Sequence, residues 1–312
     1  MKIAILGCGA LGLLWGARLS QLKNLETVLI TRTGEQQQCL CEKGLIFTSF
    51  RHQTRRIPVR AEQSSQITVN NPFDVVFVTV KQIHLADVIP LLQTITHPES
   101  QILFWQNGLG HGDQIARLRR RPWTYAAVTT EGAWKKRGNE VEHTGLGETW
   151  IGAFPKAGQP HPALLSLLDM IQGQRQDFGI SLNYDSQVLR RIWEKMAINC
   201  VINPLTAIDQ VKNGELLSGE YTVIMEEILS ETLEVAAKQG IVLDREDTMA
   251  KVRMVCRKTA GNYSSMLQDL QKGRRTEIDF INGAVVELGK KNGIDAPINQ
   301  EMVRLIHARE TG

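Results

Sequence analysis

The first twelve residues constrain the fold more than any other part of the chain. Lys2–Leu6 has the apolar composition of a short, buried strand, and apolar and small residues follow at helical spacing over residues 10–22. A strand, a glycine turn and a helix in this order predict a dinucleotide-binding unit. The turn is a complete G-x-G-x-x-G motif, made of Gly7, Cys8, Gly9, Ala10, Leu11 and Gly12.

Each glycine of this motif has its own expected role. Gly7 permits a tight turn, Gly9 lets the backbone approach a pyrophosphate, and Gly12 lets the helix pack closely on the strand. The unpaired N–H groups at the start of the helix would then hold the phosphate charge. We therefore expect the six residues of the motif to bind a dinucleotide cofactor.

The position that reads the adenosine ribose is expected about 20 residues past the glycines, after a second strand over residues 27–30. Sites that prefer NAD usually carry Asp or Glu there, whereas this chain has Thr31, Arg32 and Thr33. A guanidinium pairs with a 2′-phosphate that a carboxylate would repel, so Arg32 favours NADPH over NADH. The alternative is that Arg32 is an ordinary surface residue.

Length and composition limit the class of protein. A chain of 312 residues is long enough for two domains, and 42% hydrophobic with 22% charged residues is typical of soluble globular proteins. The net charge of +3 is too small to indicate nucleic acid, although it mildly favours anionic ligands. We find no signal-peptide pattern and no apolar stretch near about 18 residues, so we expect a cytoplasmic protein without a membrane span. The five cysteines are odd in number and scattered, so we expect neither a disulfide framework nor a metal site.

Two further strands are expected to end at the ligand-binding edge of a sheet. Residues 74–80 run into Lys81, and residues 101–105 run into Asn107. Open α/β sheets bind ligands at the carboxyl ends of their strands. Asn107 is therefore a candidate for contacting nicotinamide or substrate, and formation of an Asn-Gly turn is its alternative role.

The rest of the N-terminal half completes an α/β pattern. We expect an antiparallel pair from residues 45–49 and 56–59, a closing hairpin from residues 141–143 and 149–152, and a helix over residues 162–172.

From residue 186 onward the apolar periods are helical, without a convincing buried strand. Helices are expected over residues 219–238, 244–260 and 276–291. The fold class is therefore α/β, with a Rossmann-type dinucleotide-binding domain over residues 1–186 and an all-helical domain over residues 187–312.

One helix of this second half carries a narrow polar stripe. Lys195, Asn199 and Asn203 are spaced at i, i+4 and i+8, and the other residues from 192 to 202 are mostly apolar. Buried polar groups need partners, so the stripe either serves a polar cleft or is satisfied inside a helix-crossing network. Pro204 disfavours helical geometry at Asn203, so we expect the helix to end near the stripe.

Two more segments of the second half carry polar side chains. Residues 262–269 contain too many small polar groups for pure core. Glu277 is expected to open an otherwise apolar helix, where a carboxylate could serve a ligand or simply favour the first turn through the helix dipole.

Taken together, these motifs strongly resemble the ketopantoate reductase (2-dehydropantoate 2-reductase) family of the pathway to pantothenate and coenzyme A. The resemblance extends from the first residues to about residue 297. It rests on the glycine motif and on Gln106-Asn107-Gly108, Lys195 with Asn199 and Asn203-Pro204-Leu205-Thr206-Ala207, Asn213-Gly214-Glu215-Leu216, Ser264-Ser265-Met266-Leu267-Gln268-Asp269 and Thr276-Glu277-Ile278-Asp279-Phe280-Ile281-Asn282-Gly283.

The resemblance implies roles for individual residues. Lys195 matches the family's catalytic proton donor. Residues that match substrate contacts are Asn107, Asn199, Asn203, Asn213 and Ser265. Residues that match cofactor contacts, besides the glycine motif, are Arg32, Lys81, Asn107, Ala133 and Glu277.

The implied reaction is the NADPH-dependent reduction of ketopantoate to pantoate. It needs a hydride at C2 and a proton for the developing alkoxide, and an ammonium can both stabilise that charge and donate the proton. Burial would lower the pKa of Lys195, and Glu277 nearby would raise it again. The alternatives are a reductase of a different 2-keto acid and a non-catalytic NADPH-binding sensor. We expect a small-molecule 2-keto acid as partner, no nucleic acid, and a monomer or homodimer.

Overall fold

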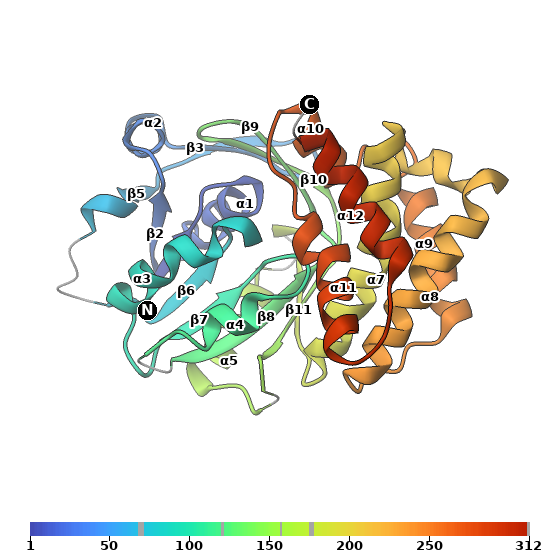
Figure 1. Ribbon diagram of the computed structural model, residues 1–312. Coiled ribbons are helices and arrows are strands. Elements are labelled where there is room, and N and C mark those ends of the chain that lie inside the picture. The colour runs from blue at the N-terminus through green and yellow to red at the C-terminus, as the bar shows by residue number, and fades with distance from the viewer. Residues whose placement is uncertain (68–71, 120–121, 157, 175–177, 311–312) are drawn as a thin grey trace. The chain divides into compact units, whose positions relative to one another are not determined.

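The computed structural model describes residues 1–67, 72–119, 122–156, 158–174 and 178–310. The chain divides into two compact units. The first unit holds Met1–Gln106 and His111–Val188, and the second holds Asn107–Gly110 and Leu189–Gly312 (Figure 1). The four residues from 107 to 110 thus group with the second unit, although their neighbours in sequence group with the first.

An eight-stranded sheet forms the centre of the first unit, in the order β12-β11-β8-β7-β6-β1-β2-β5. The six strands from β8 to β5 are parallel, β11 runs antiparallel to β8, and β12 is parallel to β11. This arrangement is the Rossmann-type sheet with two strands added at one edge. The strands are β1 (Lys2–Leu6), β2 (Glu26–Thr31), β5 (Arg60–Gln63), β6 (Val75–Val78), β7 (Gln101–Phe104), β8 (Trp123–Thr129), β11 (Glu148–Ala153) and β12 (Ser181–Tyr184).

A second, four-stranded sheet has the order β4-β3-β10-β9. Its strands are β3 (Leu45–Thr48), β4 (Thr54–Ile57), β9 (Gly132–Arg137) and β10 (Glu140–Gly145). The antiparallel pair expected near residues 45–59 is confirmed as β3 and β4.

The predicted hairpin of residues 141–143 and 149–152 is wrong. β10 pairs with β9 and β3 in the small sheet, whereas β11 pairs with β8 and β12 in the large one. The chain changes sheets at Gly147, where a Cβ would lie 2.5 Å from the Thr130 carbonyl carbon. A local pattern shows which residues of a strand are buried, but it does not identify a partner strand about a hundred residues away.

Helix α1 (Ala10–Leu19) lies between the two sheets and is buried along most of its length. Trp15 and Leu19 pack into the core on the large sheet, while Leu14 and Ala17 pack into the core formed with the small sheet. Apart from Arg18 its side chains are apolar or small on every side, which is typical of a helix buried on every side. The other helices of this unit are α2 (Gly34–Lys43), α3 (Leu85–Ile95), α4 (His111–Ile115), α5 (Pro162–Gln172) and the short turns η1 (Ser64–Gln66) and η2 (Gln82–His84).

The second unit is helical, so the predicted fold class is confirmed. Its long central helix α7 (Val188–Asp209) supplies several fully buried core side chains, including Trp193, Ala197 and Val201. The other elements are η3 (Asn213–Leu217), η4 (Gly219–Tyr221), α8 (Thr222–Lys238), α9 (Arg245–Lys258), α10 (Ser265–Gln271), η5 (Ile278–Phe280), α11 (Asn282–Lys291) and α12 (Pro297–Glu310). Within the described ranges, no helix has both the length and the apolar character needed to cross a membrane.

Two expectations for the second unit are wrong. Helix α7 does not end near Asn203, because it continues through Pro204 to Asp209. The helix expected over residues 276–291 is broken at Ile281, whose φ of −107° and ψ of −95° separate η5 from α11. Glu277 therefore precedes a short turn and does not lie in the first turn of a long helix.

Candidate functional site

In the first unit the glycine loop joins β1 to α1. A Cβ at Gly7 would lie 2.8 Å from the Val80 nitrogen, and φ there is +107°. A Cβ at Gly12 would lie 1.9 Å from the Gly7 carbonyl oxygen, whereas a Cβ at Gly9 would meet no atom within 4 Å. The protein's own packing therefore requires the outer two glycines. The middle glycine borders open space, which is the arrangement that lets a pyrophosphate approach the backbone.

Within the loop, Cys8 contributes hydrogen bonds through its backbone carbonyl, whereas its thiol is buried. Its Sγ lies 3.5 Å from the Ile30 carbonyl oxygen, and burial raises the pKa of the Cys8 thiol to about 12. The Cys8 carbonyl accepts two hydrogen bonds, from Lys135 Nζ at 2.9 Å and from Gln36 Nε2 at 3.0 Å. The sequence does not indicate that either side chain binds the loop, because Lys135 lies on β9 and Gln36 on α2, both distant from the loop along the chain.

The other predicted cofactor residues of the first unit lie at the ends of strands or beside the loop. Arg32 is exposed between β2 and α2, with no ion-pair partner among the described residues. Lys81 is half-buried and follows β6 at the start of η2. Ala133 lies on β9 and packs against the core that contains Cys8 and borders Leu11. Arg32 thus has the exposed guanidinium that a 2′-phosphate requires.

A buried ionic cluster supports this part of the first unit and was not predicted. Arg18 of α1 donates two hydrogen bonds to Glu131, at 3.0 and 2.6 Å, and both side chains are 0% exposed. His143 Nε2 lies 3.4 Å from Glu131 Oε1. Burial raises the pKa of Glu131, but the bonds from His143 and Arg18 outweigh it and leave that pKa below its usual value. The cluster therefore holds a charged carboxylate beside the start of β9.

In the second unit, the polar stripe lies on α7 as its spacing predicts. Lys195 and Asn199 are half-buried, and Asn203 is only 7% exposed. The described residues provide no hydrogen-bond partner for any of these three side chains. The stripe is therefore not satisfied by an internal network, as polar groups in a purely structural role would be.

A carboxylate acts on Lys195, and an amide is hydrogen-bonded to that carboxylate. Burial lowers the pKa of Lys195 to about 8, and the charge of Glu277 opposes that shift. Asn107 Nδ2 donates to Glu277 Oε2 at 3.3 Å. The Leu109 N–H donates to the Phe280 carbonyl at 2.9 Å, which holds the segment Asn107–Gly110 on the turn that carries Glu277.

The remaining predicted substrate residues, Asn213 and Ser265, lie near the start of α10. Ser264 caps α10, and its Oγ lies 2.8 Å from Thr206 Oγ1 of α7. These bonds fix the start of α10, where the next residue, Ser265, is exposed. Asn213 donates from Nδ2 to Thr259 Oγ1 at 2.8 Å, and its buried Oδ1 has no partner among the described residues. The amide N–H₂ of Asn213 is thus already engaged, unlike the amides of the stripe.

The predicted residues of each unit have a chemistry of their own. The glycine loop and Arg32 can hold a dinucleotide phosphate chain and an adenosine phosphate. Lys195 can donate a proton and stabilise negative charge, and the amides of Asn199 and Asn203 can bind polar groups of a small anionic substrate. No group of three or more His, Cys, Asp or Glu side chains arranged for a metal ion occurs among the residues described.

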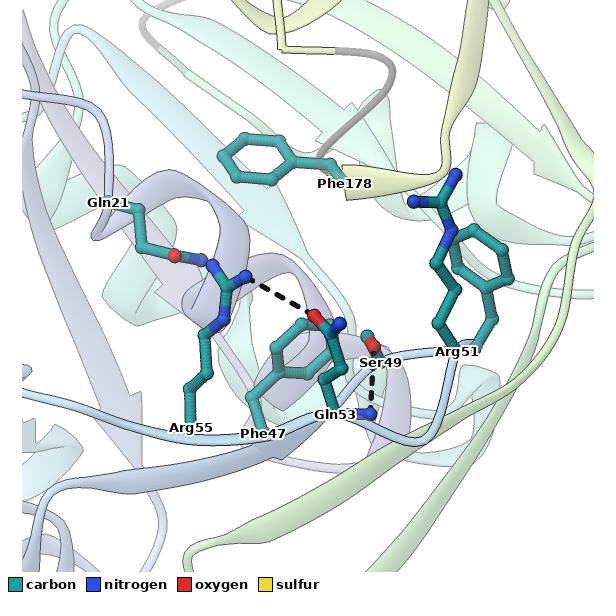
Figure 2. Close-up of a pocket in the computed structure, with 8 residues that line it drawn as sticks. Gln21, Phe47, Ser49, Arg51, Gln53, Arg55 and Phe178 are labelled. Carbon is teal, nitrogen blue, oxygen red and sulfur yellow. Dashed lines mark hydrogen bonds between the residues drawn. The ribbon is translucent and has the colours of Figure 1, made fainter.

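A hollow lies in the first unit (Figure 2). Gln21, just past the C-terminal end of α1, borders it, whereas the glycine loop is at the other end of that helix. Arg51 lies over the Phe50 ring at 5.4 Å, and Arg55 donates to Gln53 at 3.4 Å. None of the predicted site residues lines this hollow, which is bordered by Gln21, Phe47, Ser49, Phe50, Arg51, Gln53, Arg55 and Phe178.

Comparison with known proteins matches both parts of the chain. The family model described as "Ketopantoate reductase PanE/ApbA" matches residues 3–156, and "Ketopantoate reductase PanE/ApbA C terminal" matches residues 187–310. A curated 2-dehydropantoate 2-reductase from Archaeoglobus fulgidus is 32% identical over 312 residues, which cover 100% of this chain and 98% of the relative.

Two solved structures are similar over the whole chain. A ternary complex of D-mandelate dehydrogenase with NADH and anilino(oxo)acetate has a TM-score of 0.89 and 27% identity, covering 100% of this chain and 98% of its own. A probable 2-dehydropantoate 2-reductase from Bacillus subtilis has a TM-score of 0.82 and 31% identity, covering 99% of this chain and 100% of its own.

Proposed function

The chain belongs to the ketopantoate reductase family, and from that premise we propose that it reduces 2-dehydropantoate (ketopantoate) to pantoate with NADPH, in pantothenate biosynthesis. The observation that carries the proposal is the Lys195–Asn199–Asn203 stripe, whose side chains have no hydrogen-bond partner among the described residues, in a chain that matches the family in both parts. NADPH, when bound, supplies the hydride for C2 of the keto acid.

Lys195 is proposed as the proton donor of this reduction. As C2 gains two electrons and a hydrogen, its carbonyl oxygen becomes an alkoxide, and the Lys195 ammonium stabilises that charge and then gives it a proton. A pKa of about 8 suits this role, because the side chain is still mostly protonated near neutrality and is acidic enough to donate. The charge of Glu277 supports the protonated form.

The other predicted residues are proposed to bind and orient. Asn199, Asn203, Asn213 and Ser265 would contact the keto acid, and Asn107 would contact both substrate and cofactor. The open side of Gly9 and the exposed guanidinium of Arg32 support an NADPH site in the first unit. The residues of the first unit proposed to bind NADPH are Gly7, Cys8, Gly9, Ala10, Leu11, Gly12, Arg32, Lys81 and Ala133. In the second unit, Glu277 and Asn107 are proposed as further cofactor contacts.

We further propose residues 1–186 as the NADPH-binding domain and residues 187–312 as the substrate domain. We propose that the protein is a monomer or homodimer, and that it is located in the cytoplasm. A dimeric ketopantoate reductase from Staphylococcus aureus, 22% identical to this chain with a TM-score of 0.80, has the same fold.

A second candidate is the reduction of another 2-keto acid by the same residues. The similarity to a D-mandelate dehydrogenase favours it, because mandelate is the reduced form of an aromatic 2-keto acid. A cofactor sensor without catalysis is less favoured, since a sensor needs the glycine loop but not Lys195.

The test is an assay of purified protein with NADPH and a panel of keto acids. The loss of reduced-nicotinamide absorbance measures the rate with each one. Ketopantoate should give a kcat/KM well above those of pyruvate, 2-ketoisovalerate and phenylglyoxylate. A higher value with phenylglyoxylate would support the second candidate. NADPH binding without turnover of any keto acid would support the sensor.

A further inference from the structure

Pro204 removes a backbone hydrogen bond from the middle of α7. In an α-helix the N–H of residue 204 would donate to the carbonyl of Cys200, but proline has no N–H. Helix α7 nevertheless continues to Asp209. Because Cys200 is 0% exposed, water cannot easily replace the lost donor, and a buried carbonyl without a partner destabilises the fold.

Asn282 supplies the missing donor from another helix. Its Nδ2 lies 2.9 Å from the Cys200 carbonyl oxygen, and the same amide nitrogen donates to Asn299 Oδ1, also at 2.9 Å. Asn299 in turn donates to Glu231 Oε2 at 2.8 Å and to the Ile228 carbonyl at 3.2 Å. Asn282 and Asn299 are both 0% exposed. The donor is therefore held in one orientation from both sides.

The position of this bond connects it with the stripe. Cys200 follows Asn199 directly, so its carbonyl lies at the level of the stripe between Asn199 and Asn203. Asn282 is the first residue of α11 and follows the turn that begins at Glu277. One hydrogen bond thus joins the helix that carries Lys195 to the segment that carries Glu277.

We propose that Asn282 is a positioning residue of the keto-acid site: by replacing the donor that Pro204 lacks, it fixes α7 against the Glu277 turn and so holds Lys195 beside Glu277. This inference rests on the proposed function. Asn282 itself need not touch substrate or cofactor. Its effect on the reaction passes through the relative position of Lys195 and Glu277.

A double-mutant cycle tests the hydrogen-bond part. Pro204→Ala restores an N–H that can bond to the Cys200 carbonyl, so Asn282→Ala should lower the melting temperature clearly less in the Pro204→Ala background than in wild type. Asn282→Ala also removes the bond to Asn299, but it does so in both backgrounds, so this loss cancels when the two drops in melting temperature are compared. An equal drop in both backgrounds would overturn the proposal.

A matched control keeps the cycle specific. Asn292 also donates from Nδ2 to a helix carbonyl, that of Leu288 at 2.7 Å, but it is exposed and lies at the other end of α11. Asn292→Ala should show no coupling with Pro204→Ala. If Asn282→Ala alone fails to fold, the double variant should recover folding, and its failure to do so would also count against the proposal.

The proposal that Asn282 positions Lys195 needs a measurement that a change in stability alone would not alter. Asn282→Ala should lower kcat at least tenfold with an unchanged Kd for NADPH, and NMR titration should show a lower pKa for Lys195 because the ammonium loses its fixed distance to Glu277. Adding Pro204→Ala should recover part of both changes. An unchanged kcat and Lys195 pKa in folded Asn282→Ala protein would overturn the positioning role.

The two proposals fail in different ways. If the wild-type chain reduces no keto acid, the proposed function is wrong, yet the melting cycle and the Lys195 titration still decide whether Asn282 holds Lys195 beside Glu277. If wild-type reduction is efficient and Asn282→Ala matches it, only the positioning role is wrong.

Discussion

Lys135 Nζ donates a hydrogen bond to the carbonyl oxygen of Cys8, 2.9 Å away, so a lysine from β9 fixes one peptide of the glycine loop. Gln36 donates to the same oxygen. In a planar trans peptide the C=O and the following N–H point in opposite directions, so the Gly9 N–H points away from Lys135. The Gly9 N–H therefore points to the side opposite Lys135 and Gln36, where it can donate to a bound phosphate.

Lys135→Met is expected to weaken NADPH binding. Without the ammonium, the Cys8–Gly9 peptide loses its charged donor and the loop spends less time in the binding orientation. A charge-assisted hydrogen bond contributes roughly 1.5–3 kcal/mol, so the Kd should rise about tenfold or more. Calorimetric titration with NADPH measures it. The control is Lys136→Met, an exposed neighbour paired with Glu142 at 2.7 Å, which should leave the Kd unchanged.

Lys195→Ala is expected to remove the proton donor while leaving cofactor binding intact. The kcat for keto-acid reduction should fall by roughly 10²–10⁴-fold, the usual contribution of a positioned acid. Asn203→Ala and Ser265→Ala should mainly raise KM, because binding groups act whether or not the substrate is reacting. If Lys195→Ala instead lowers the melting temperature and keeps kcat per folded molecule, the lysine is structural.

The pH dependence of kcat is expected to follow the Lys195 ammonium. Because the acid form is the active one and its pKa is about 8, kcat should be level below that pH and fall above it. Glu277→Gln removes the charge that raises this pKa, so the alkaline fall should move to lower pH. A fall that stays in place, or moves to higher pH, would contradict the assignment of Lys195 as the acid.

Cofactor choice is expected to depend on Arg32. Replacing it with Ala removes the exposed cation proposed to pair with the 2′-phosphate, so the kcat/KM for NADPH should fall while that for NADH changes little. A charged pair of this kind contributes about 1.5–3 kcal/mol, or roughly ten- to a hundredfold. Steady-state comparison of both cofactors measures it, and an unchanged ratio would remove Arg32 from the site.

The buried Arg18–Glu131 pair is expected to matter for stability. Glu131→Ala leaves the Arg18 guanidinium buried without its carboxylate, which typically costs about 3–5 kcal/mol in free energy of unfolding. Urea denaturation measures it. Glu26→Ala is the control, because it breaks an exposed pair with Arg60 at 2.9 Å and should cost under about 1 kcal/mol. Equal losses in the two variants would mean that burial of the Arg18 pair adds nothing.

Patterns that depend on neighbouring residues could be predicted from the sequence. The strand, glycine turn and helix from Lys2 to Leu19 follow from local spacing, and so does the start of α9, where Asp244 accepts from the Asp247 N–H at 2.7 Å. The stripe of Lys195, Asn199 and Asn203 follows from helical periodicity in the same way.

What could not be predicted depends on partners distant in sequence. Helix α7 passes through Pro204 because Asn282, 82 residues after Cys200, replaces the lost donor. The pairing of β10 with β3 crosses from Glu140 to Ile46, and Lys135 is 127 residues from the carbonyl that it binds. No local pattern contains such contacts.

The segment Asn107–Gly110 belongs to the second unit, and Asn107 bonds to Glu277, 170 residues later. During synthesis on the ribosome this segment emerges long before the rest of its unit. The segment therefore cannot form these contacts until the Glu277 turn has also been translated. A fragment that begins at Leu189 would lack four residues of its own fold, so cleavage or gene splitting at that point should leave the Glu277 turn incomplete.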